Sequence, residues 1–466
     1  MDRTLVSDTL KTVGKDVKLN GWVDTIRDHG KVTFIDLRDR TGLVQCVGSK
    51  LPKVTSESVV EIIGKVANRP EKLVNPNLDT GKVEVQVKKL KILALSAEQL
   101  PFPIEGDGLD IEEELRLRYR YLDLRRKRLQ KNIRIRSDYV QAVRKYFFSK
   151  DFVEIETPIL TKSTPEGSRD FIVPSRIYPG KFYALPQSPQ QYKQLLMTAG
   201  FENYFQIARC IRDEDPRADR SYEHTQIDIE MSFVEREDVM RTVEENTIFA
   251  LEKVGAKIAK KPFPVFTYNE AMKKFGSDKF DLRSEKEKKE NVMSFAWVVD
   301  FPFFKRNKEG KWTFTHNPFS APLGDKHEKW LLQGKYVDKI VTSQYDLVCN
   351  GYEIAGGSIR THKPEVLEAT YKVMGYKKEE IKESVGHMIE AFSYGTPPHG
   401  GCAQGVERTL MTYLGEDYLR ELQAFPMTGR GRTAVMDAPT KATSEQLKEL
   451  KLKVYRKMNY EKNRTS

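Results

Sequence analysis

Short apolar runs separated by polar turns make up most of residues 1–104. Within these runs apolar and polar side chains partly alternate, as in strands that bury one face. Turn residues at positions 28–30 and 41–42 separate the first three runs. The pattern therefore predicts five strands, with the sequences VKLNGWV, VTFIDLRD, GLVQCVG, VVEIIGKVANR and KVEVQVKKLKILAL.

Five short strands with a closing return predict a small β-barrel in residues 1–104. An OB-fold, which often binds single-stranded nucleic acid, and a generic barrel fit the pattern equally well. Residues 105–136 then start acidic and become basic, with ten lysines and arginines against one aspartate between Arg116 and Arg136. We expect residues 105–134 to be a hinge leading into a helix, whose basic face either contacts a phosphate backbone or is simply solvated.

The rest of the chain mixes helical and strand periods. Apolar side chains recur at helical spacing in SDYVQAVRKYFFSKDF and EDVMRTVEENTIFALEKVG, whereas FVEIETPIL, IDIEMSFV and SFAWVVDFPFF are strand-like. Strands separated by unequal insertions predict an α+β domain over residues 135–439, with a mainly antiparallel sheet and flanking helices. We expect the lysine-rich residues 440–466 to fray or to dock as a helix.

Composition restricts the function without deciding it. The chain has 78 lysines and arginines and 67 aspartates and glutamates, and its formal charge of +11 permits contact with nucleic-acid phosphates. The four cysteines have no CxxC spacing, so we expect a cytoplasmic location and neither a disulfide framework nor a structural zinc site. Since no apolar run approaches about 20 residues, we expect no membrane-spanning helix.

Residues 211–228, IRDEDPRADRSYEHTQID, indicate chemistry rather than packing. Arginines alternate with carboxylates there, and no helical or strand period appears before QIDIEMSF. This alternation suits a site that holds a polyphosphate and a metal together. Farther along, Asp346 and Glu353 are seven residues apart. Two carboxylates on neighbouring strand positions can share a Mg²⁺ ion, although by themselves these two also fit ordinary surface acids.

The charged segment resembles motif 2 of the class II aminoacyl-tRNA synthetases, in the form found in bacterial-type aspartyl-tRNA synthetases. The resemblance covers almost the whole chain, with motif 1 near residues 140–160, motif 2 near 205–233 and motif 3 near 395–415. It implies an OB-fold anticodon-binding domain and a class II catalytic domain. The implied reaction activates L-aspartate with ATP to aspartyl-adenylate and transfers it to the 3′ end of tRNA(Asp). The other segments that carry the resemblance are RYRYLDLRR, TPEGSRDF, LPQSPQQYKQLLM, NGYEIAGGSIR and YGTPPHGGCAQGVER.

The resemblance implies which residues contact ATP and Mg²⁺. Arg212, on the α-phosphate, and Arg408, on the γ-phosphate and adenine, are the implied catalytic residues. Arg217 is a second γ-phosphate ligand, and Glu214 reads the adenine amino group. His224 either stacks on adenine or is a partly buried histidine with a backbone partner. The implied ATP-binding residues are Arg212, Glu214, Arg217, His224, Glu353 and Arg408, and the implied metal ligands are Asp346 and Glu353.

The resemblance also implies how aspartate is selected. Lys193 and Arg360 match the two cations that face the side-chain carboxylate of the substrate, and His316 is a third candidate. Asn317 stands where relatives commonly have a second histidine, and Ala355 where many have a glycine. The ammonium group of the substrate needs acceptors and anions. The residues implied for the ammonium group are Glu166, Ser188, Gln190 and Asp228.

Residues of the predicted barrel correspond to positions that contact anticodon bases. They are Arg27, His29, Phe34 and Gln45, although Phe34 also suits a place in the barrel core. Histidine at position 29 occurs in relatives that charge tRNA(Asn) as well as tRNA(Asp). Lys72 points the other way, because relaxed relatives tend to have a small residue nearby. Charging of tRNA(Asn) is therefore an open hypothesis.

Two further expectations concern the whole chain. Motif 1 builds the dimer interface in relatives, so the resemblance implies a homodimer, and Asp151 replaces the usual glycine there. Bacterial-type relatives carry a large domain between motifs 2 and 3, whereas here a charged bridge at residues 284–291 spans that interval. We therefore expect the large insertion domain to be absent.

Two alternative functions stay open. The chain could be a related ligase for asparagine or lysine, although Lys193, Arg360 and the QSPQ segment argue against that reading. It could also be a non-catalytic RNA-binding paralogue. Such proteins usually lose the motif 2 or motif 3 arginine, and both Arg212 and Arg408 are present.

Overall fold

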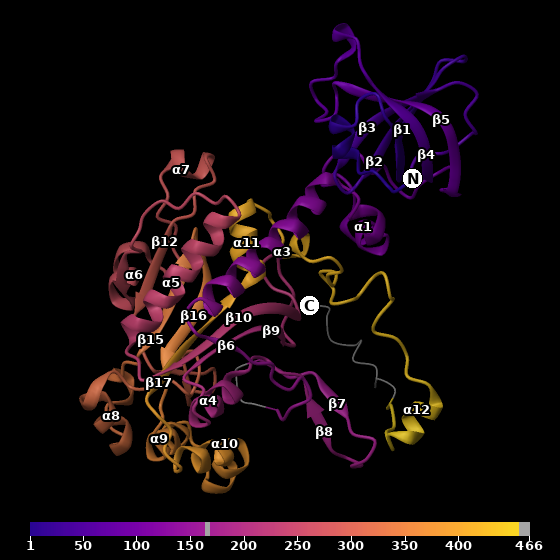
Figure 1. The fold of residues 1–466 in the computed structure, drawn as a ribbon. Coiled ribbons are helices and arrows are strands. Elements are labelled where there is room, and N and C mark those ends of the chain that lie inside the picture. Colours follow the sequence, from indigo (N-terminus) through magenta and orange to yellow (C-terminus); the bar gives the residue numbers. More distant parts are fainter. Residues whose placement is uncertain (164–167, 456–466) are drawn as a thin grey trace, which may run out of the picture. The chain divides into compact units, whose positions relative to one another are not determined.

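The chain forms two compact units that meet at the Pro103–Ile104 boundary. A computed structural model describes residues 1–163 and 168–455. The first unit contains the five predicted strands, and the second contains the mixed sheet and most of the helices (Figure 1). Among the described residues, none of the helices combines the length and apolar character needed to cross a bilayer.

The first unit is a closed barrel with the strand order β1-β2-β3-β5-β4. Alternate side chains of each strand point inward, and residues such as Leu19, Ile35, Leu37 and Ile62 are fully buried in its core. The order and closure are those of the expected OB-fold. The elements are η1 (Val6–Lys11), β1 (Asp16–Asp28), β2 (Thr33–Asp39), β3 (Gly42–Gly48), β4 (Val59–Asn68), η2 (Glu71–Leu73) and β5 (Val83–Ala94).

The second unit is built on a mixed sheet that is mainly antiparallel, as predicted. Within the described residues its strand order is β11-β12-β15-β16-β17-β10-β9-β6, and only the two outermost pairs are parallel. The strands are β6 (Val153–Glu154), β9 (Asn203–Ile211), β10 (Glu223–Ser232), β11 (Val265–Thr267), β12 (Phe295–Val299), β15 (Gln344–Cys349), β16 (Tyr352–Ile359) and β17 (His399–Gly405). Separate hairpins pair β7 (Ile172–Pro174) with β8 (Phe182–Ala184), and β13 (Phe304–Arg306) with β14 (Trp312–Phe314).

Helices surround this sheet, and they follow the predicted helical segments closely. The helices are α1 (Glu113–Arg118), α2 (Arg120–Asp123), α3 (Lys127–Phe148), α4 (Gln190–Thr198), α5 (Arg236–Lys253), α6 (Tyr268–Phe275), α7 (Glu285–Lys289), α8 (Gly324–Gln333), α9 (Pro364–Val373), α10 (Lys378–Phe392), α11 (Val406–Leu414) and α12 (Ser444–Glu449). Two 3-10 turns, η3 (Val337–Lys339) and η4 (Leu419–Leu422), complete the described elements.

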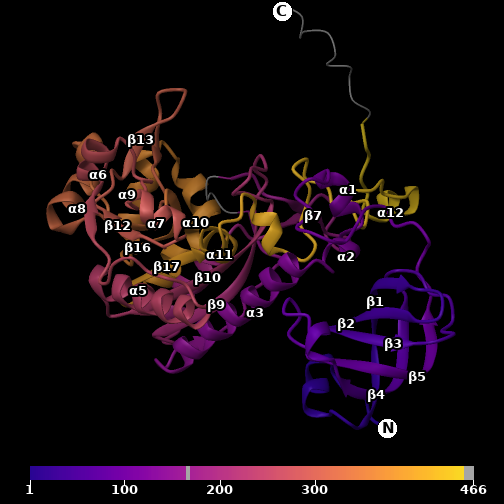
Figure 2. The same cartoon turned by 90° about the horizontal axis from the view of Figure 1, so that it is seen from above.

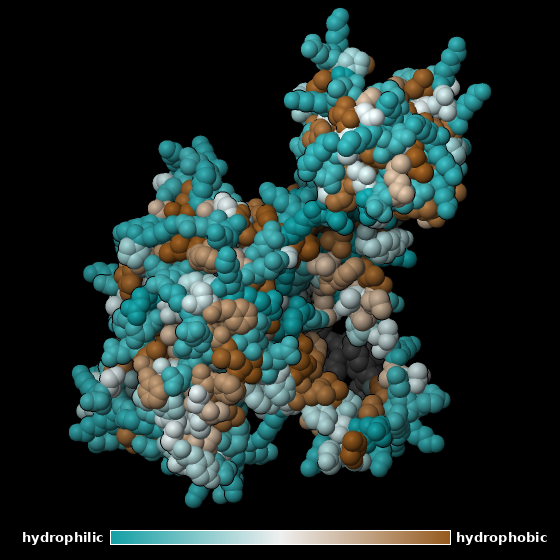
Figure 3. All heavy atoms as spheres, in the orientation of Figure 1, coloured by the Kyte–Doolittle hydropathy of each residue, from teal (hydrophilic) through white to brown (hydrophobic). Residues whose placement is uncertain are grey.

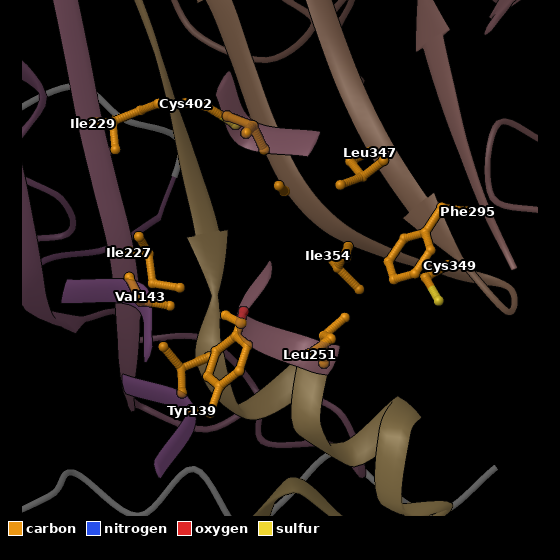
Figure 4. Close-up of a cluster of buried hydrophobic side chains, with 14 of the residues drawn as sticks. Tyr139, Val143, Ile227, Ile229, Leu251, Phe295, Leu347, Cys349, Ile354 and Cys402 are labelled. Carbon is orange, nitrogen blue, oxygen red and sulfur yellow. The ribbon is translucent and has the colours of Figure 1, made fainter. Parts of the chain in front are cut away.

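The main core lies between one face of the sheet and helices α3, α5 and α11. Figure 4 shows Tyr139 and Val143 of α3 close to Ile227 of β10, with Leu251 of α5 near Ile354 of β16. Helices α3 and α5 lie side by side in both ribbon views (Figures 1 and 2). This packing buries one face of the sheet and leaves the opposite face for polar residues.

The basic residues expected in a hinge are packed into the second unit instead. Arg116, Arg120 and Arg126 are buried, and the prediction of a basic face on solvent or phosphate is wrong for all three. Arg120 and Arg126 donate to the Asp123 carboxylate at 2.7 and 2.8 Å, while Arg116 donates to Glu421 at 2.9 Å. The reason is charge pairing, because a buried guanidinium is stable only beside carboxylates that satisfy it.

Motif 1 differs from the sequence prediction in the length of its strand. The segment FVEIETPIL forms only the two-residue strand β6, at the edge of the sheet beside β9. Asp151 has a φ of 58°, in the left-handed region, so the backbone keeps the glycine-like conformation although a side chain is present. Aspartate adopts this region more readily than most other residues.

On the visible face of the second unit, hydrophilic residues predominate and apolar ones are scattered (Figure 3).

Candidate active site

The polar face of the sheet forms the floor of a cavity of about 660 Å³. Its walls come from the turn between β9 and β10, from the start of α11 and from the segments before α7 and after β14. The cavity brings together most of the predicted site residues. Those that line it are Ser188, Gln190, Arg212, Glu214, Arg217, His224, Asp228, His316, Glu353, Arg360 and Arg408.

Strand register explains why there is room above the sheet. Asp228 of β10 pairs with Ala403 of β17, which pairs with Gly356 of β16, which pairs with Asp346 of β15. Partners in neighbouring strands point to the same face, so two carboxylates flank two very small residues. A Cβ atom added at Gly356 would lie 3.1 Å from Asp346 Oδ1 and 3.8 Å from Glu353 Oε1. The small residues therefore make the cavity floor.

The turn between β9 and β10 carries the motif 2 arginines. Arg212 follows the last residue of β9, and its Nε donates to the Gln187 carbonyl at 3.3 Å. Arg217 lines the cavity, and its backbone N–H donates to the Arg220 carbonyl at 2.9 Å. Glu214, expected to read adenine, is held by Arg220 at 2.6 Å. The turn thus presents cations to the cavity while its own carboxylates hold it in shape.

Arg408, from the first turn of α11, lines the same cavity as these arginines. Its Nη1 donates to the Glu353 carbonyl at 2.7 Å, and its Nη2 lies 3.2 Å from Asp219 Oδ2. Asp219 belongs to the β9–β10 turn, so Arg408 connects motif 3 to motif 2. The cavity therefore contains guanidinium groups from two distant parts of the chain, as binding of a polyphosphate requires.

His224 also lines the cavity and carries no charge at neutral pH. Burial, and then the positive charge of Arg212, lower its pKa to about 3. The Thr225 backbone N–H beside it donates to the buried carboxylate of Glu407 at 2.9 Å. Glu407 is itself paired with Arg136 at 2.8 Å. A neutral ring held in this way can stack on a planar aromatic ligand.

Asp346 and Glu353 lie close together at the β15–β16 side of the cavity. Burial, and then the charge of Glu353, raise the pKa of Asp346 well above its ordinary value. Burial also acts to raise the pKa of Glu353, but the ammonium of Lys279, 2.8 Å from Glu353 Oε2, holds that pKa below its ordinary value. Gln344 donates to Asp346 at 2.6 Å. Lys279 is a cavity residue that the sequence did not predict.

Four buried charged groups lie together at the other end, where two of them, Asp228 and Arg360, line the cavity. Lys193 lies 2.9 Å from Asp228 and 3.1 Å from Glu230, and Arg360 lies 2.9 Å from Glu230. Glu230, which sequence reasoning missed, therefore engages both cations expected to face a substrate carboxylate. Arg360 also donates to Ser358 Oγ at 2.8 Å. Lys193 lies behind the carboxylates rather than on the cavity wall.

Burial has a clear effect on Asp228. It raises the pKa of this carboxyl group to about 6, although Lys193 acts to lower it. Neither carboxylate oxygen accepts a well-aligned hydrogen bond, despite the ion pair with Lys193. A buried carboxylate aimed into a cavity with unused acceptor capacity is suited to bind an ammonium group.

The remaining predicted residues of this site differ in how they are placed. Ser188 and Gln190 lie at the start of α4, where the Gln190 backbone N–H donates to Ser188 Oγ at 3.3 Å. His316 Nδ1 is 3.8 Å from Asp346 Oδ2, which places the ring at the carboxylate pair. Asn317, beside it, accepts a hydrogen bond from the Phe319 backbone at 2.9 Å. Glu166 lies outside the described residues.

The predicted anticodon residues share the outer face of the barrel. Arg27 of β1 pairs directly with Phe34 of β2, and Arg27 forms an ion pair with Asp36 at 2.9 Å. The His29 and Phe34 rings contact each other edge to face at 5.7 Å. Phe34 is only half-buried and does not belong to the barrel core. Gln45 points the same way but is 93% buried, so little of its amide is available to a base.

Comparison with known proteins decides the family. Residues 112–429 match the family described as tRNA synthetases class II (D, K and N). The chain belongs to this family. Residues 17–93 match the description OB-fold nucleic acid binding domain, which coincides with the barrel. This class II synthetase therefore joins a nucleic-acid-binding barrel to an aminoacylation unit.

Relatives of this class II synthetase share nearly its whole length. Proteins named aspartate–tRNA(Asp/Asn) ligase from Cereibacter sphaeroides and Chlorobaculum parvum are 38% and 40% identical to it. Each match covers 95% of this chain, and 97% and 94% of the relative respectively. The Cereibacter alignment extends over 577 residues, so this relative contains segments with no counterpart in a chain of 466 residues.

Solved structures show the same fold. Aspartyl-tRNA synthetase from Entamoeba histolytica has a TM-score of 0.70 at 23% identity, over 91% of each chain. Asparaginyl-tRNA synthetase from Pyrococcus horikoshii, complexed with asparaginyl-adenylate, has a TM-score of 0.72 at 23% identity, over 92% of this chain and 98% of the other. In the synthetase described here, residues 276–294 connect α6 to β12, and α7 is the one helix or strand within that stretch, all of which the structure describes. This agrees with the expected loss of the large insertion domain.

Proposed function

We propose that this synthetase is an aspartate–tRNA ligase, which activates L-aspartate with ATP and transfers it to tRNA. The observation that carries the proposal is the arrangement of charges along one cavity. Arg212 and Arg408 face one part of it, and Arg360 and Asp228 lie at its floor. Relatives named aspartate–tRNA(Asp/Asn) ligase support the choice of amino acid.

The chemistry follows from charge stabilisation. The α-carboxylate of aspartate attacks the α-phosphate of ATP and displaces pyrophosphate, so two anions must approach each other. Arg212 neutralises the charge that develops on the α-phosphate, while Arg408 and Arg217 hold the terminal phosphates. The neutral ring of His224 stacks on adenine. The chain supplies positions and charges for this reaction and no covalent nucleophile.

The substrate itself changes the balance of charges at the floor. Lys193 and Arg360 face Asp228 and Glu230, so the four groups are neutral together. In the proposal, the substrate ammonium pairs with Asp228, and the substrate side-chain carboxylate approaches Arg360. Asparagine offers no negative charge to Arg360. Bound asparagine would therefore leave the buried Arg360 without the negative charge that aspartate brings, and this disfavours asparagine.

We propose Asp346 and Glu353 as the residues that hold Mg²⁺. The two carboxylates lie near Gly356, where one added carbon atom would crowd Asp346 and contact Glu353, so the glycine backbone keeps the space beside them open. No group of three or more His, Cys, Asp or Glu residues within the described ranges could hold a metal. Two carboxylates suffice for Mg²⁺, which keeps waters and takes phosphate oxygens as its other ligands. When bound, the ion neutralises phosphate charge.

The direct test is aminoacylation of purified tRNA(Asp) with radiolabelled L-aspartate, ATP and MgCl₂. We expect acid-precipitable aspartyl-tRNA to accumulate and the Arg212→Ala variant to be almost inactive. A protein that binds tRNA yet forms no aminoacyl-tRNA with any amino acid would instead be a non-catalytic RNA-binding paralogue.

We further propose that the enzyme charges tRNA(Asn) as well as tRNA(Asp). The exposed ring of His29 lies against Phe34 on the outer face of the barrel, where an unpaired base can stack. The names of the relatives, with both tRNAs, support this reading. Aspartylation of both purified tRNAs is the expected result, and the absence of aspartyl-tRNA(Asn) contradicts this part of the proposal.

A homodimer is the third part of the proposal. Apolar side chains of motif 1, namely Phe148, Val153, Ile159 and Leu160, are exposed, and β6 lies at the edge of the sheet. Such a face suits a second copy of the same chain. Sedimentation equilibrium should give a dimer that Leu160→Lys weakens and Met272→Lys, on exposed α6, leaves intact. A monomeric wild-type protein contradicts the proposal.

We also propose that the protein works in the cytoplasm. Its four cysteines are buried and have no CxxC spacing, as suits a reducing compartment. Fractionation of cells of the source organism should recover the protein with the cytoplasmic markers, and recovery with an exported fraction contradicts this assignment.

A further inference from the structure

Lys279 contacts Glu353, one of the two proposed metal-binding carboxylates, from outside the sheet. It lies in the segment between α6 and α7, where its side chain lines the cavity and is 47% exposed. Its Nζ is 2.8 Å from Glu353 Oε2. None of the ATP, aspartate or metal assignments above involves this residue. A lysine at this point nevertheless has to interact with whatever cation Glu353 binds.

The segment that carries Lys279 is anchored on both sides of it. Helix α6 ends at Gly276, whose φ of 71° turns the chain toward the cavity. The Lys279 backbone N–H donates to Ser277 Oγ at 3.0 Å. Phe280, the next residue, is buried and stacks on Phe275 at 4.1 Å, and its carbonyl accepts from the Gly351 backbone at 3.1 Å. The backbone is fixed, so only the flexible lysine side chain has freedom to move.

The charges around Lys279 are unbalanced in favour of a cation. Burial acts to lower the pKa of its ammonium, but Glu353, and then Asp278 and Asp346, raise the pKa above its ordinary value. The ammonium therefore lies among three acidic side chains, of which Glu353 is in contact with it. A second cation can enter this cluster, but it has to compete with Lys279 for Glu353.

We propose that Lys279 is a built-in counter-cation that competes with Mg²⁺ for Glu353 and passes to the phosphates of ATP when the metal binds. The inference rests on the proposed function and deepens it. A lysine ammonium is a compact charge on a flexible four-carbon stem, so it can move between neighbouring anions. Mg²⁺ in such sites takes both carboxylates and phosphate oxygens as ligands. The phosphates of ATP are then the anions to which Lys279 moves.

The competition has a consequence for the order of binding. Without ATP, a metal ion held by Asp346 and Glu353 would leave Lys279 with only Asp278 of its three acidic neighbours. With ATP, the displaced ammonium finds phosphate oxygens. The enzyme therefore binds free divalent cations weakly and takes up the metal together with the nucleotide.

The test is binding of Mn²⁺ alone, as MnCl₂ without ATP, measured by electron paramagnetic resonance on the full-length protein. We expect Lys279→Met to tighten Mn²⁺ binding at least tenfold. The control is Arg220→Met, which removes another cation of the cavity wall that pairs with Glu214 rather than Glu353. If only the lost contact with Glu353 matters, this control changes Mn²⁺ affinity less than twofold.

Other outcomes overturn the proposal. Unchanged or weaker Mn²⁺ binding by Lys279→Met would show that the lysine does not compete with the metal, and equal tightening in both variants would indicate a general charge effect. As a second measurement, the KM for ATP in ATP–pyrophosphate exchange should rise about tenfold in Lys279→Met. An unchanged KM contradicts the transfer to ATP. Aspartate-dependent exchange by the wild-type enzyme tests the proposed function separately.

Discussion

At the scale of single residues, the cavity is organised by which charges already have a partner. Glu214 is held by Arg220, Asp219 by Arg408 and Glu353 by Lys279. Arg212 faces the same space, with its Nε on the Gln187 carbonyl. Its role is therefore the most directly testable, because its substitution removes a cation while disturbing few contacts of the protein itself.

Replacing Arg212 with alanine should lower aspartate-dependent ATP–pyrophosphate exchange by about 100- to 1000-fold, the effect typical of removing one transition-state donor. Arg209→Ala is the matched control, because Arg209 lies on β9 and pairs with Glu223 outside the cavity. The control should keep most of its activity, and circular dichroism should show both variants folded. Full exchange activity in Arg212→Ala contradicts the mechanism.

The pH dependence should report on Asp228. Its pKa of about 6 means that the carboxylate is charged above that pH and neutral below it. Since only the charged form attracts the substrate ammonium, kcat/KM for aspartate should fall as the pH drops through about 6. His224 and His399, with pKa values of about 3 and about 4, stay neutral throughout this range. A flat profile from pH 7 to 5 in folded enzyme argues against this role.

At the scale of elements, the alternation of side chains along strands says more about which residues face the cavity than the helical patterns do. Asp228 and Glu230 are two residues apart in IDIEMSF, so both had to face the same side of β10, and Glu230 could have been found from that period. Lys279 could not, because no period marks it. Its contact with Glu353 depends on how the chain returns from α6 to the sheet.

The basic segment shows why composition misled the prediction there. Its alternating arginines suggested a surface for phosphates, but Asp123 and Glu421 draw Arg116, Arg120 and Arg126 into the protein. Glu421 lies some 300 residues away in the sequence, so nothing local could reveal the pairing. The prediction of a long strand at FVEIETPIL was wrong for a similar reason, because the length of a strand depends on the strand with which it pairs.

Removing one of these arginines should destabilise the second unit. Arg120→Met leaves Asp123 and Glu421 with fewer cations in a buried place, at a cost of about 3–5 kcal/mol in the free energy of unfolding. A lower midpoint of thermal unfolding by calorimetry checks this. Arg118→Met, at the exposed end of α1, is the control and should leave the midpoint unchanged. Equal stability of both variants would mean that the ion pairs of Arg120 with Asp123 and Glu421 do not stabilise the second unit.

At the scale of the whole molecule, the two units divide the function. The barrel was predictable strand by strand, because its five runs are short, partly alternating and separated by turns. The order of the mixed sheet was not, since β10 pairs with β17 from about 170 residues later. If the barrel chooses the tRNA and the cavity chooses the amino acid, a change in one should leave the other step intact.

His29→Leu should test this division. The variant should lose aspartylation of tRNA(Asn) at least tenfold relative to tRNA(Asp), because His29 lies on the exposed face of the barrel. Aspartate-dependent ATP–pyrophosphate exchange, which needs no tRNA in this account, should be unaffected. A parallel loss of exchange would show that the two steps are not separable.

The most direct test of the central claim is ATP–pyrophosphate exchange by the purified wild-type chain with aspartate, asparagine and lysine in parallel. The buried cations Lys193 and Arg360 predict that aspartate supports exchange with a kcat/KM at least 100-fold above that of asparagine, and that lysine supports none. Exchange driven best by asparagine or lysine, or no exchange with aspartate, would contradict the account.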